Sequence, residues 1–198
     1  MWKKKDADFA TGQQKGERQV ASRKLSQTVV ATGAERFFDK NEIIVSKTDL
    51  KGNLTYVNDV FLRISDYTEP ELLGQPHSLI RHIDMPRVIF KLLWSYLQDG
   101  KEIFAYVNNF AKNGDNYWVL AHVTPSLDDG GNVVGYHSNR RVPKRDILEN
   151  TIIPLYKQLL EIENNESSRK VGLQKSEQKL TEIVAAQEVS YDEFILSI

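Results

Sequence analysis

The sequence contains no cysteine among its 198 residues. This absence excludes structural disulfides, thiolate zinc sites, iron–sulfur clusters and a cysteine nucleophile. The charges nearly cancel, with 26 Lys and Arg residues against 27 Asp and Glu residues. The net charge is −1, so the protein does not have the broadly basic composition that favours binding to nucleic-acid phosphates. DNA or RNA is therefore not an expected partner.

Long apolar runs are also missing. The basic residues 3–5 are followed by no apolar stretch, and no window reaches the roughly 20 apolar residues that a membrane span requires. With 40% hydrophobic residues, the composition is that of an ordinary globular protein. We therefore expect a cytoplasmic protein without a direct membrane span.

The middle of the chain combines short strand patterns with one long helical stretch, an order typical of the α+β class. Turn residues at 50–53 separate the first two strands, and an Asn-Gly pair at 113–114 separates two later ones. The long helix is expected over residues 85–97, with Asp84 and Pro86 at its start. The strands of an antiparallel sheet of about five strands are expected at residues 43–45, 54–57, 103–111, 117–123 and 133–137.

Helical patterns flank this middle part. Residues 17–38 predict a weakly amphipathic helix, and residues 147–187 carry an apolar stripe that is interrupted at 164–168. The second segment forms either a short coiled coil or a solvated helix that packs on a partner. The expected division is an N-terminal extension over 1–40, a central domain over 41–143 and a C-terminal helical extension over 144–198.

The central domain carries a set of short motifs. They are Thr-Asp-Leu at 48–50, Asn-Asp-Val-Phe at 58–61, Ser-Asp-Tyr at 65–67, Glu-Leu-Leu-Gly-Gln-Pro-His at 71–77, Arg-His-Ile-Asp-Met-Pro at 81–86, Trp94, Lys-Asn-Gly-Asp at 112–115 and Tyr-Trp-Val at 117–119. This set closely resembles the sensory PAS domain of the bacterial aerotaxis receptors. The resemblance covers about residues 42–143, and it implies a PAS fold that holds FAD and reports its redox state.

The motif at 81–86 supplies candidate ligands for the diphosphate of FAD. A planar guanidinium binds phosphate oxygens with two parallel hydrogen bonds, better than an ammonium does. The resemblance assigns cofactor binding to Arg81, His82 and Asp84. The alternative is that Arg81 is a surface cation paired with Asp84.

Four further residues are candidates for the same site. Asn58 matches a cofactor-binding position of the family, and it also suits the N-cap of the helix that follows. Trp94 and Trp118 match positions where an indole packs against an aromatic cofactor, although plain core packing is the alternative for both. The Asn109 amide is able to bond a flavin edge, unless strand alternation turns Asn108 inward instead.

The chain departs from those receptors at two positions that we expect to line the site. His122 stands where a small polar amide is typical, and Phe104 stands where a Trp is typical. Photochemistry of the LOV kind is excluded, because it needs a flavin–cysteine bond and His77 follows Gly-Gln-Pro where that cysteine would stand. Haem is the alternative cofactor, with candidate ligands at His77, His82, His122 and His137.

The expected function is a non-catalytic redox or oxygen sensor for energy taxis, with FAD bound noncovalently. It signals by contact with a separate membrane-bound chemotaxis transducer or another signalling protein, and the terminal helices are the expected contact or homodimer surfaces. The alternatives are a haem-based gas or redox sensor and a cofactor-free PAS interaction module. An enzyme is not expected, because no dinucleotide fingerprint, nucleophile motif or paired carboxylates are present.

Overall fold

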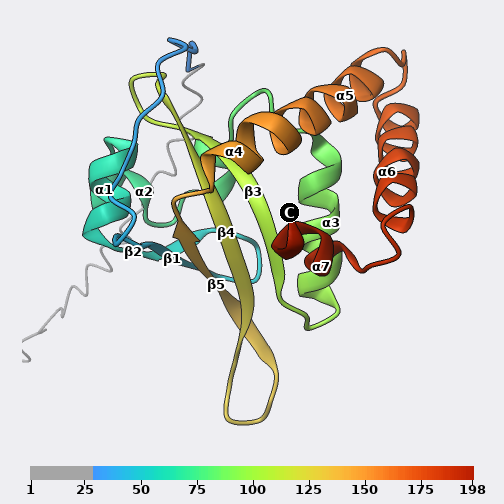
Figure 1. Cartoon of the computed structure of the whole chain (residues 1–198). Coiled ribbons are helices and arrows are strands. Elements are labelled where there is room, and N and C mark those ends of the chain that lie inside the picture. The colour runs from blue at the N-terminus through green and yellow to red at the C-terminus, as the bar shows by residue number, and fades with distance from the viewer. Residues whose placement is uncertain (1–28) are drawn as a thin grey trace, which may run out of the picture.

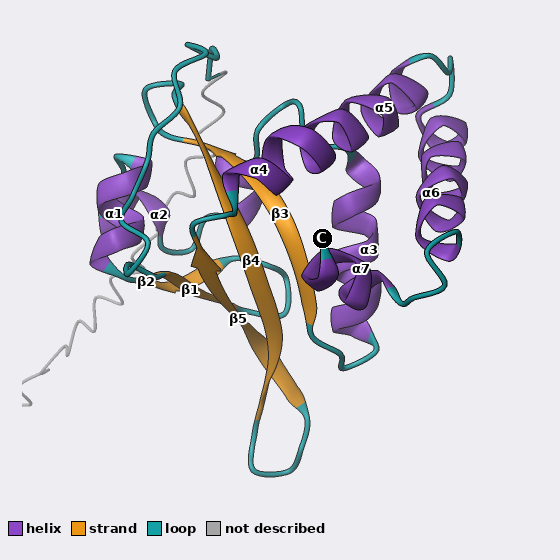
Figure 2. Ribbon diagram, viewed as in Figure 1, coloured by secondary structure: helices purple, strands orange, loops and turns teal. Residues whose placement is uncertain are grey.

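The computed structural model describes residues 29–198, and Figure 1 shows their path. Five strands form one antiparallel sheet in the order β2-β1-β5-β4-β3, with helices gathered around it (Figure 2). The strands are β1 (Ile44–Thr48), β2 (Leu54–Val57), β3 (Ile103–Phe110), β4 (Asn116–Leu127) and β5 (Val133–Arg141). The predicted α+β class and the five-stranded antiparallel sheet are confirmed.

The helices precede and follow the last three strands. Between β2 and β3 lie α1 (Asp59–Ser65), α2 (Glu69–Leu72), the 3-10 turn η1 (His77–Ile80) and α3 (Arg87–Gln98). After β5 come α4 (Arg145–Ile147), the π-helical turn η2 (Leu148–Ile152), α5 (Ile153–Asn164), α6 (Arg169–Ala185) and α7 (Tyr191–Ser197). The predicted interruption at 164–168 is the corner between α5 and α6. Within residues 29–198, no helix combines the length and the apolar character needed to cross a bilayer.

The sheet has two chemically different faces because side chains alternate along each strand. In β4, residues 117, 119, 121 and 123 are buried while the residues between them are half-buried. The register pairs Asn109 with Tyr117 across the predicted Asn-Gly turn. The face that carries Asn109 and residues 121 and 123 points toward α3, and we call it the inner face.

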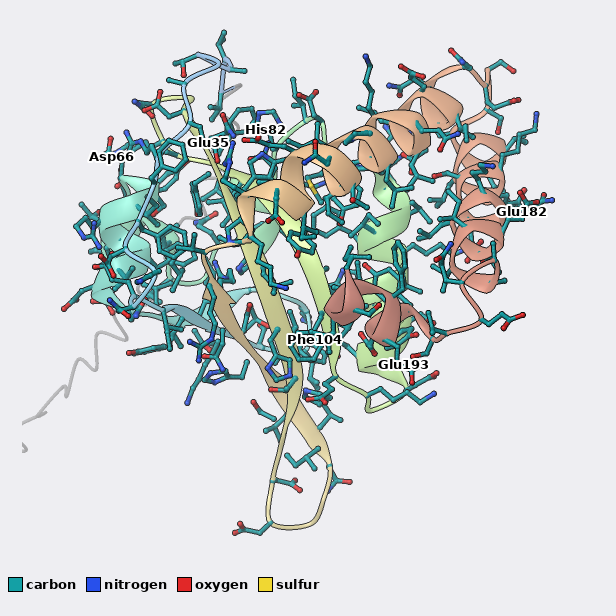
Figure 3. All side chains as sticks on the ribbon, viewed as in Figure 1. Glu35, Asp66, His82, Phe104, Glu182 and Glu193 are labelled. Atoms are coloured by element: carbon teal, nitrogen blue, oxygen red, sulfur yellow. The ribbon has the colours of Figure 1, made fainter. Side chains whose placement is uncertain are left out.

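The segment before β1 does not form the predicted helix where the structure describes it. Residues 29–38 of the expected helix 17–38 form no helix, and the rest of that helix lies outside the described residues. Thr32 N donates to Gly114 O at 2.9 Å, and Arg36 N donates to Asn116 O at 2.7 Å. Because the β3–β4 turn satisfies these backbone groups, the segment lies beside the turn instead of coiling. Glu35 then reaches Arg145 at the start of α4, near which Figure 3 places it.

Helix α3 starts two residues later than predicted, and a distant residue caps its first turn. Pro86 is the N-cap residue and offers no side-chain hydrogen bond, while the Asp84 side chain is exposed. Glu163, at the end of α5, accepts hydrogen bonds from Arg87 N and Val88 N, each at 2.9 Å. The prediction that Asp84 begins this helix is therefore wrong, because a carboxylate from another helix satisfies its first N–H groups.

The free edge of β3 is closed by three other segments. Phe104 N donates to Asp192 Oδ1 of α7 at 3.1 Å, and Figure 3 shows Phe104 beside that helix. The Tyr156 hydroxyl of α5 donates to Tyr106 O at 2.7 Å, and His82 N donates to Asn108 O at 3.3 Å. The C-terminal helices therefore attach to the sheet through its backbone as well as through apolar packing.

The Tyr156 hydrogen bond can be tested against a matched tyrosine. Tyr156→Phe is expected to lower the free energy of unfolding by about 1 kcal/mol, because the buried Tyr106 carbonyl loses its hydroxyl donor. Tyr191→Phe is the control, because the Tyr191 hydroxyl is equally buried among the described residues and has no partner. Urea unfolding of both variants measures the difference. A Tyr191→Phe loss as large as that of Tyr156→Phe would contradict this account.

Candidate functional site

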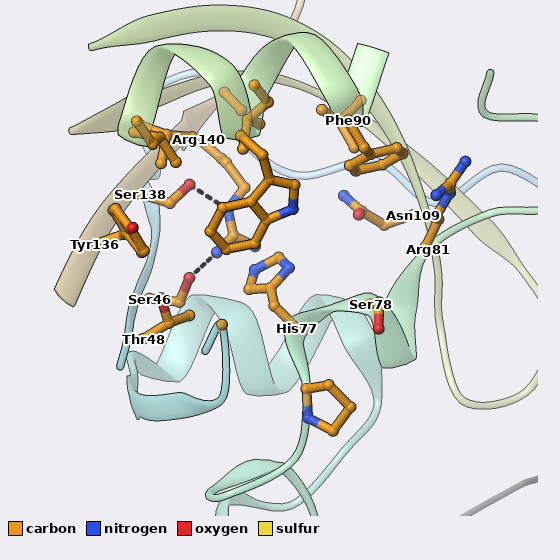
Figure 4. A pocket seen from close by; sticks show the side chains of 18 of the residues that line it. Ser46, Thr48, His77, Ser78, Arg81, Phe90, Asn109, Tyr136, Ser138 and Arg140 are labelled. Atoms are coloured by element: carbon orange, nitrogen blue, oxygen red, sulfur yellow. Dashed lines mark hydrogen bonds between the residues drawn. The ribbon is translucent and has the colours of Figure 1, made fainter. Parts of the chain in front are cut away.

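A cavity of about 410 Å³ lies between α3 and the inner face of the sheet. Figure 4 shows it from close by, with side chains converging from α3, η1, β1, β3 and β5. The α3 wall is apolar and consists of Phe90, Leu93, Trp94 and Leu97. The sheet side mixes small apolar residues with polar ones, so the cavity suits a ligand with an apolar plane and a polar edge.

Trp94 is fixed in this wall by two contacts. Its ring meets Tyr136 edge to face, with centroids 5.4 Å apart. On another side lies Gly52, which has φ +82°, and a Cβ added there would stand 3.2 Å from the indole. The β1–β2 turn therefore needs glycine both for its backbone conformation and for the approach of this ring.

Arg140 is the charged residue of the inner face. It is 2% exposed, its Nε donates to Ser138 Oγ at 3.1 Å, and its Nη2 donates to Ser46 Oγ. The Phe61 ring lies 4.9 Å from the guanidinium, and Nη1 has no partner among the described residues. Burial lowers the pKa of Arg140 to about 10, so the group keeps its positive charge at neutral pH. Within residues 29–198, no carboxylate forms an ion pair with it.

His77 and Asn109 add two further polar groups. The Nε2 of His77 and the Nδ2 of Asn109 are both buried, and neither has a partner in the described part of the chain. Desolvation, followed by the charge of Arg140, lowers the pKa of His77 to about 3. The cavity thus collects a neutral imidazole, an amide and a guanidinium, each with unused hydrogen-bonding capacity.

Arg81 lies at one end of the cavity, beside Asn109 and Phe90 (Figure 4). Its guanidinium lies 4.0 Å from the centroid of the Phe90 ring, and Nη2 donates to Met85 O at 2.9 Å. Desolvation lowers the pKa of Arg81 from its usual value. No ion pair between Arg81 and Asp84 occurs among the described residues, and Asp84 Oδ2 lies instead 3.6 Å from His82 Nδ1, so the alternative of an Arg81–Asp84 surface pair is wrong.

Three of the seven predicted site residues line the cavity, namely Arg81, Trp94 and Asn109. Strand alternation turns Asn109 inward and leaves Asn108 on the other face, where it accepts a hydrogen bond from Asn116. Trp118 pairs with Asn108 in the register and shares that outer face, with its ring 6.1 Å from Tyr156 of α5. Trp118 therefore packs on the C-terminal helices and not on the cavity.

The remaining predicted residues hold the structure around the cavity. Asn58 is the N-cap of α1, and its Oδ1 accepts from Phe61 N at 3.1 Å and from Val45 N at 2.9 Å. The buried His82 ring packs on Phe110, with centroids 4.1 Å apart, and its Nδ1 accepts from Asp84 N. Asn58, His82 and Asp84 are absent from the lining.

The two positions at which the chain departs from the aerotaxis receptors also lie elsewhere. His122 and Phe104 face each other across β3 and β4 on the outer face, with stacked rings 4.2 Å apart. His122 Nε2 lies 2.8 Å from Glu102 Oε2. The expectation that these positions line the cavity is therefore wrong. Side chains alternate along each strand, and those of both residues point to the outer face.

Comparison with known proteins identifies the domain. Residues 54–140 match the family model described as the PAS fold. The chain contains a PAS domain. It is 42% identical over 117 residues to the aerotaxis receptor of Escherichia coli K12, a match that covers 59% of this chain and 22% of the receptor.

A second relative matches over a similar part of the chain. The identity to the nitrogen fixation regulatory protein of Klebsiella pneumoniae is 29% over 103 residues, covering 52% of this chain and 21% of that protein. The chain thus spans about a fifth of the length of these two relatives. Among solved structures, the light-state LOV domain of the photoreceptor Aureochrome1 matches with a TM-score of 0.51 and 18% identity, over 55% of this chain and 88% of that one. This likeness shows the fold of the PAS domain alone.

Sequence reasoning missed the polar group on the inner face of the sheet. Arg140, Ser46 and Ser138 were not among the predicted site residues, although all three line the cavity. One signal was available in β5, where Tyr136, Ser138 and Arg140 alternate on one face. A buried face that carries serine and arginine in place of apolar residues indicates a ligand site.

The lowered pKa of His77 predicts a pH-dependent loss of stability. In the unfolded chain the imidazole takes up a proton near pH 6.5, but in the folded protein it does so only near pH 3. Its contribution to stability is therefore lost as the pH falls from 6.5 toward 3, by at most about 1.4 kcal/mol per pH unit. In urea unfolding of the ligand-free protein, His77→Gln is expected to flatten the slope between pH 6.5 and 5. An unchanged slope would show that the imidazole ionises freely.

Proposed function

We propose that this chain is a redox sensor that binds FAD noncovalently in the cavity between α3 and the sheet. The observation that carries the proposal is the pair of buried, unpartnered N–H groups on Arg140 and Asn109 within a largely apolar cavity. A flavin offers hydrogen-bond acceptors along one edge and an apolar plane across the rest. The cavity supplies donors for the first and the Trp94 wall for the second.

Arg81 supports the assignment of a ligand with a diphosphate. Among the described residues its side-chain hydrogen bond goes to Met85 O alone, so its other N–H groups are available to phosphate oxygens. Its place at one end of the cavity, away from Arg140, suits a ligand whose polar groups lie at two separate points. The 42% identity to a protein named as an aerotaxis receptor supports FAD as that ligand.

Each lining residue then has a separate task. Bound FAD supplies reversible electron transfer. The positive charge of Arg140 favours the reduced flavin, which carries more negative charge than the oxidised one. Ser46 and Ser138 fix the direction of the guanidinium, and Gly52 fixes the indole of Trp94.

A non-catalytic role is supported by the chemistry of the lining. No Asp or Glu belongs to the part of the cavity wall that the structure describes, and the His77 Nε2 forms no hydrogen bond with a described serine or carboxylate. General acid–base or nucleophilic catalysis needs such paired groups. The cavity is therefore better suited to holding a redox group than to turning over a substrate.

The proposed output is contact with another protein in the cytoplasm, either a membrane-bound chemotaxis transducer or another signalling protein. The name of the aerotaxis receptor, which the chain matches over 22% of that receptor's length, supports a chemotactic partner. The homodimer expected from the terminal segments stays a prediction.

Haem is the second candidate ligand, and one observation favours it. The Nε2 of His77 is enclosed without a partner, and its burial keeps the imidazole in the neutral form that binds iron. His82, His122 and His137, the other predicted haem ligands, are not part of the lining. The absorption spectrum separates the two ligands.

Arg81→Ala tests the proposed phosphate contact. The variant is expected to bind FAD roughly tenfold to a hundredfold more weakly, because a hydrogen bond to a charged group contributes about 1.5–3 kcal/mol. The measurement is the visible spectrum of the purified protein before and after dithionite, together with the identity of the compound released on denaturation. The wild type is expected to show a two-band flavin spectrum that bleaches and to release FAD.

Arg141→Ala is the control for this test, because Arg141 is an exposed arginine at the end of β5 and does not line the cavity. It is expected to keep the flavin spectrum. A single intense Soret band in the wild type would identify haem, and not FAD, as the ligand. A wild-type protein that stays colourless after incubation with either compound would favour a cofactor-free interaction module.

Arg140→Gln tests the charge beside the proposed flavin. Loss of the cation is expected to make the midpoint potential more negative by tens of millivolts, because for a two-electron couple about 1.4 kcal/mol corresponds to about 30 mV. Spectroscopic redox titration measures the potential, with Arg141→Gln as the exposed control. A midpoint potential equal to that of the wild type would contradict the placement of Arg140 beside the flavin.

A further inference from the structure

Helix α3 serves two different structures at once. One side carries Phe90, Trp94 and Leu97 into the cavity. Val88 and Leu92 point instead toward α6 and α7, and Figure 1 shows α6 running alongside α3. Any shift of α3 therefore changes both the cavity wall and the surface on which α6 and α7 pack.

Glu163 is the strongest polar link between α3 and those helices. Its side chain is 1% exposed, and its carboxylate accepts from Arg87 N, Val88 N and, at 2.8 Å, Arg87 Nε. The Arg87 side chain also donates to Arg169 O at 2.8 Å. One carboxylate and one guanidinium thus join the first turn of α3 to the end of α5 and the start of α6.

The corner between α5 and α6 is fixed at the same point. Gly172 lies so close to the backbone of Glu163 that an added Cβ would stand 2.5 Å from Glu163 O. This contact ties the position of Glu163 to α6 as well as to α5. If the α5–α6 hairpin moves, the carboxylate moves with it.

Val88 of α3 and Leu180 of α6 belong to one apolar core, but the rest of the contact between the two helices is incomplete. A second hollow of about 370 Å³ lies between α3, α6 and α7. The Lys91–Glu177 ion pair crosses the gap, but both side chains are close to half exposed, and such pairs contribute little. Of the two described ion pairs between α3 and the hairpin, the buried one with Glu163 is therefore the stronger.

We propose that Glu163 is a positioning residue of the cavity, and that it couples ligand binding to the docking of the α5–α6 hairpin on α3. Partial withdrawal of this carboxylate would leave two N–H groups and a guanidinium without their acceptor, so the contact is either complete or lost. A ligand that packs against Trp94 biases the position of α3 and hence this contact. By linkage, the docked hairpin must favour the ligand by the same factor.

The proposal rests on the proposed function, and hydrogen–deuterium exchange with mass spectrometry on the full chain tests both. In the wild type, FAD is expected to slow amide exchange in α6. In Glu163→Gln, α6 is expected to exchange at least about fivefold faster without FAD, FAD is expected to bind more weakly, and slowing by FAD is lost. Glu161→Gln, an exposed glutamate two residues earlier on α5, is expected to behave as the wild type.

Arg87→Lys is the second variant, in case Glu163→Gln does not fold. It keeps the charge beside Glu163 but loses the guanidinium contact to Arg169 O, and it is expected to reduce the slowing by FAD. FAD binding with the same slowing in Glu163→Gln as in the wild type would overturn the coupling alone. A wild type that binds FAD with no change in α6 would do the same. A wild type that takes up no FAD would overturn the proposed function and the coupling together.

Discussion

The start of α3 depends on a carboxylate that belongs to the C-terminal helices. A helix needs acceptors for its first N–H groups, and α3 follows Pro86, whose side chain offers none. Glu163 supplies them from 76 residues further along the chain. Because α3 forms the cavity wall and also contacts α6, this buried polar contact joins the PAS domain to the C-terminal helices, alongside the hydrogen bonds to β3 and the shared apolar core.

Much of the fold could be predicted because its signals are local. The Asn-Gly turn and the alternation of β4 fix the β3–β4 hairpin and its register, and Asn58 begins α1 as a capping residue should. The start of α3 and the path of residues 29–38 could not be predicted in this way. Their hydrogen-bond partners, Glu163 and the β3–β4 turn, are far away in the sequence, so no local pattern contains them.

The site was partly predictable for the same reason. Strand parity separates Asn109 from Asn108 only once the register is known, and it moves Trp118 and His122 to the outer face. Arg140 follows the strand expected at 133–137 and was not singled out, yet it lies buried with two serine hydroxyls and no carboxylate partner among the described residues. A buried cation without a carboxylate partner lowers the free energy of unfolding. Such costs are typical of residues that serve binding.

The closed edge of β3 limits how this protein can associate. An open edge strand invites a strand from another molecule to add to the sheet, which is a common route to aggregation. Here Asp192, Tyr156 and the backbone of His82 already occupy polar groups along that edge. At the opposite edge, β2 has four residues, and Leu54 is already bonded to the backbone of residues 74 and 75. A second molecule that approaches the sheet therefore meets side chains on its face in place of a continuous backbone edge.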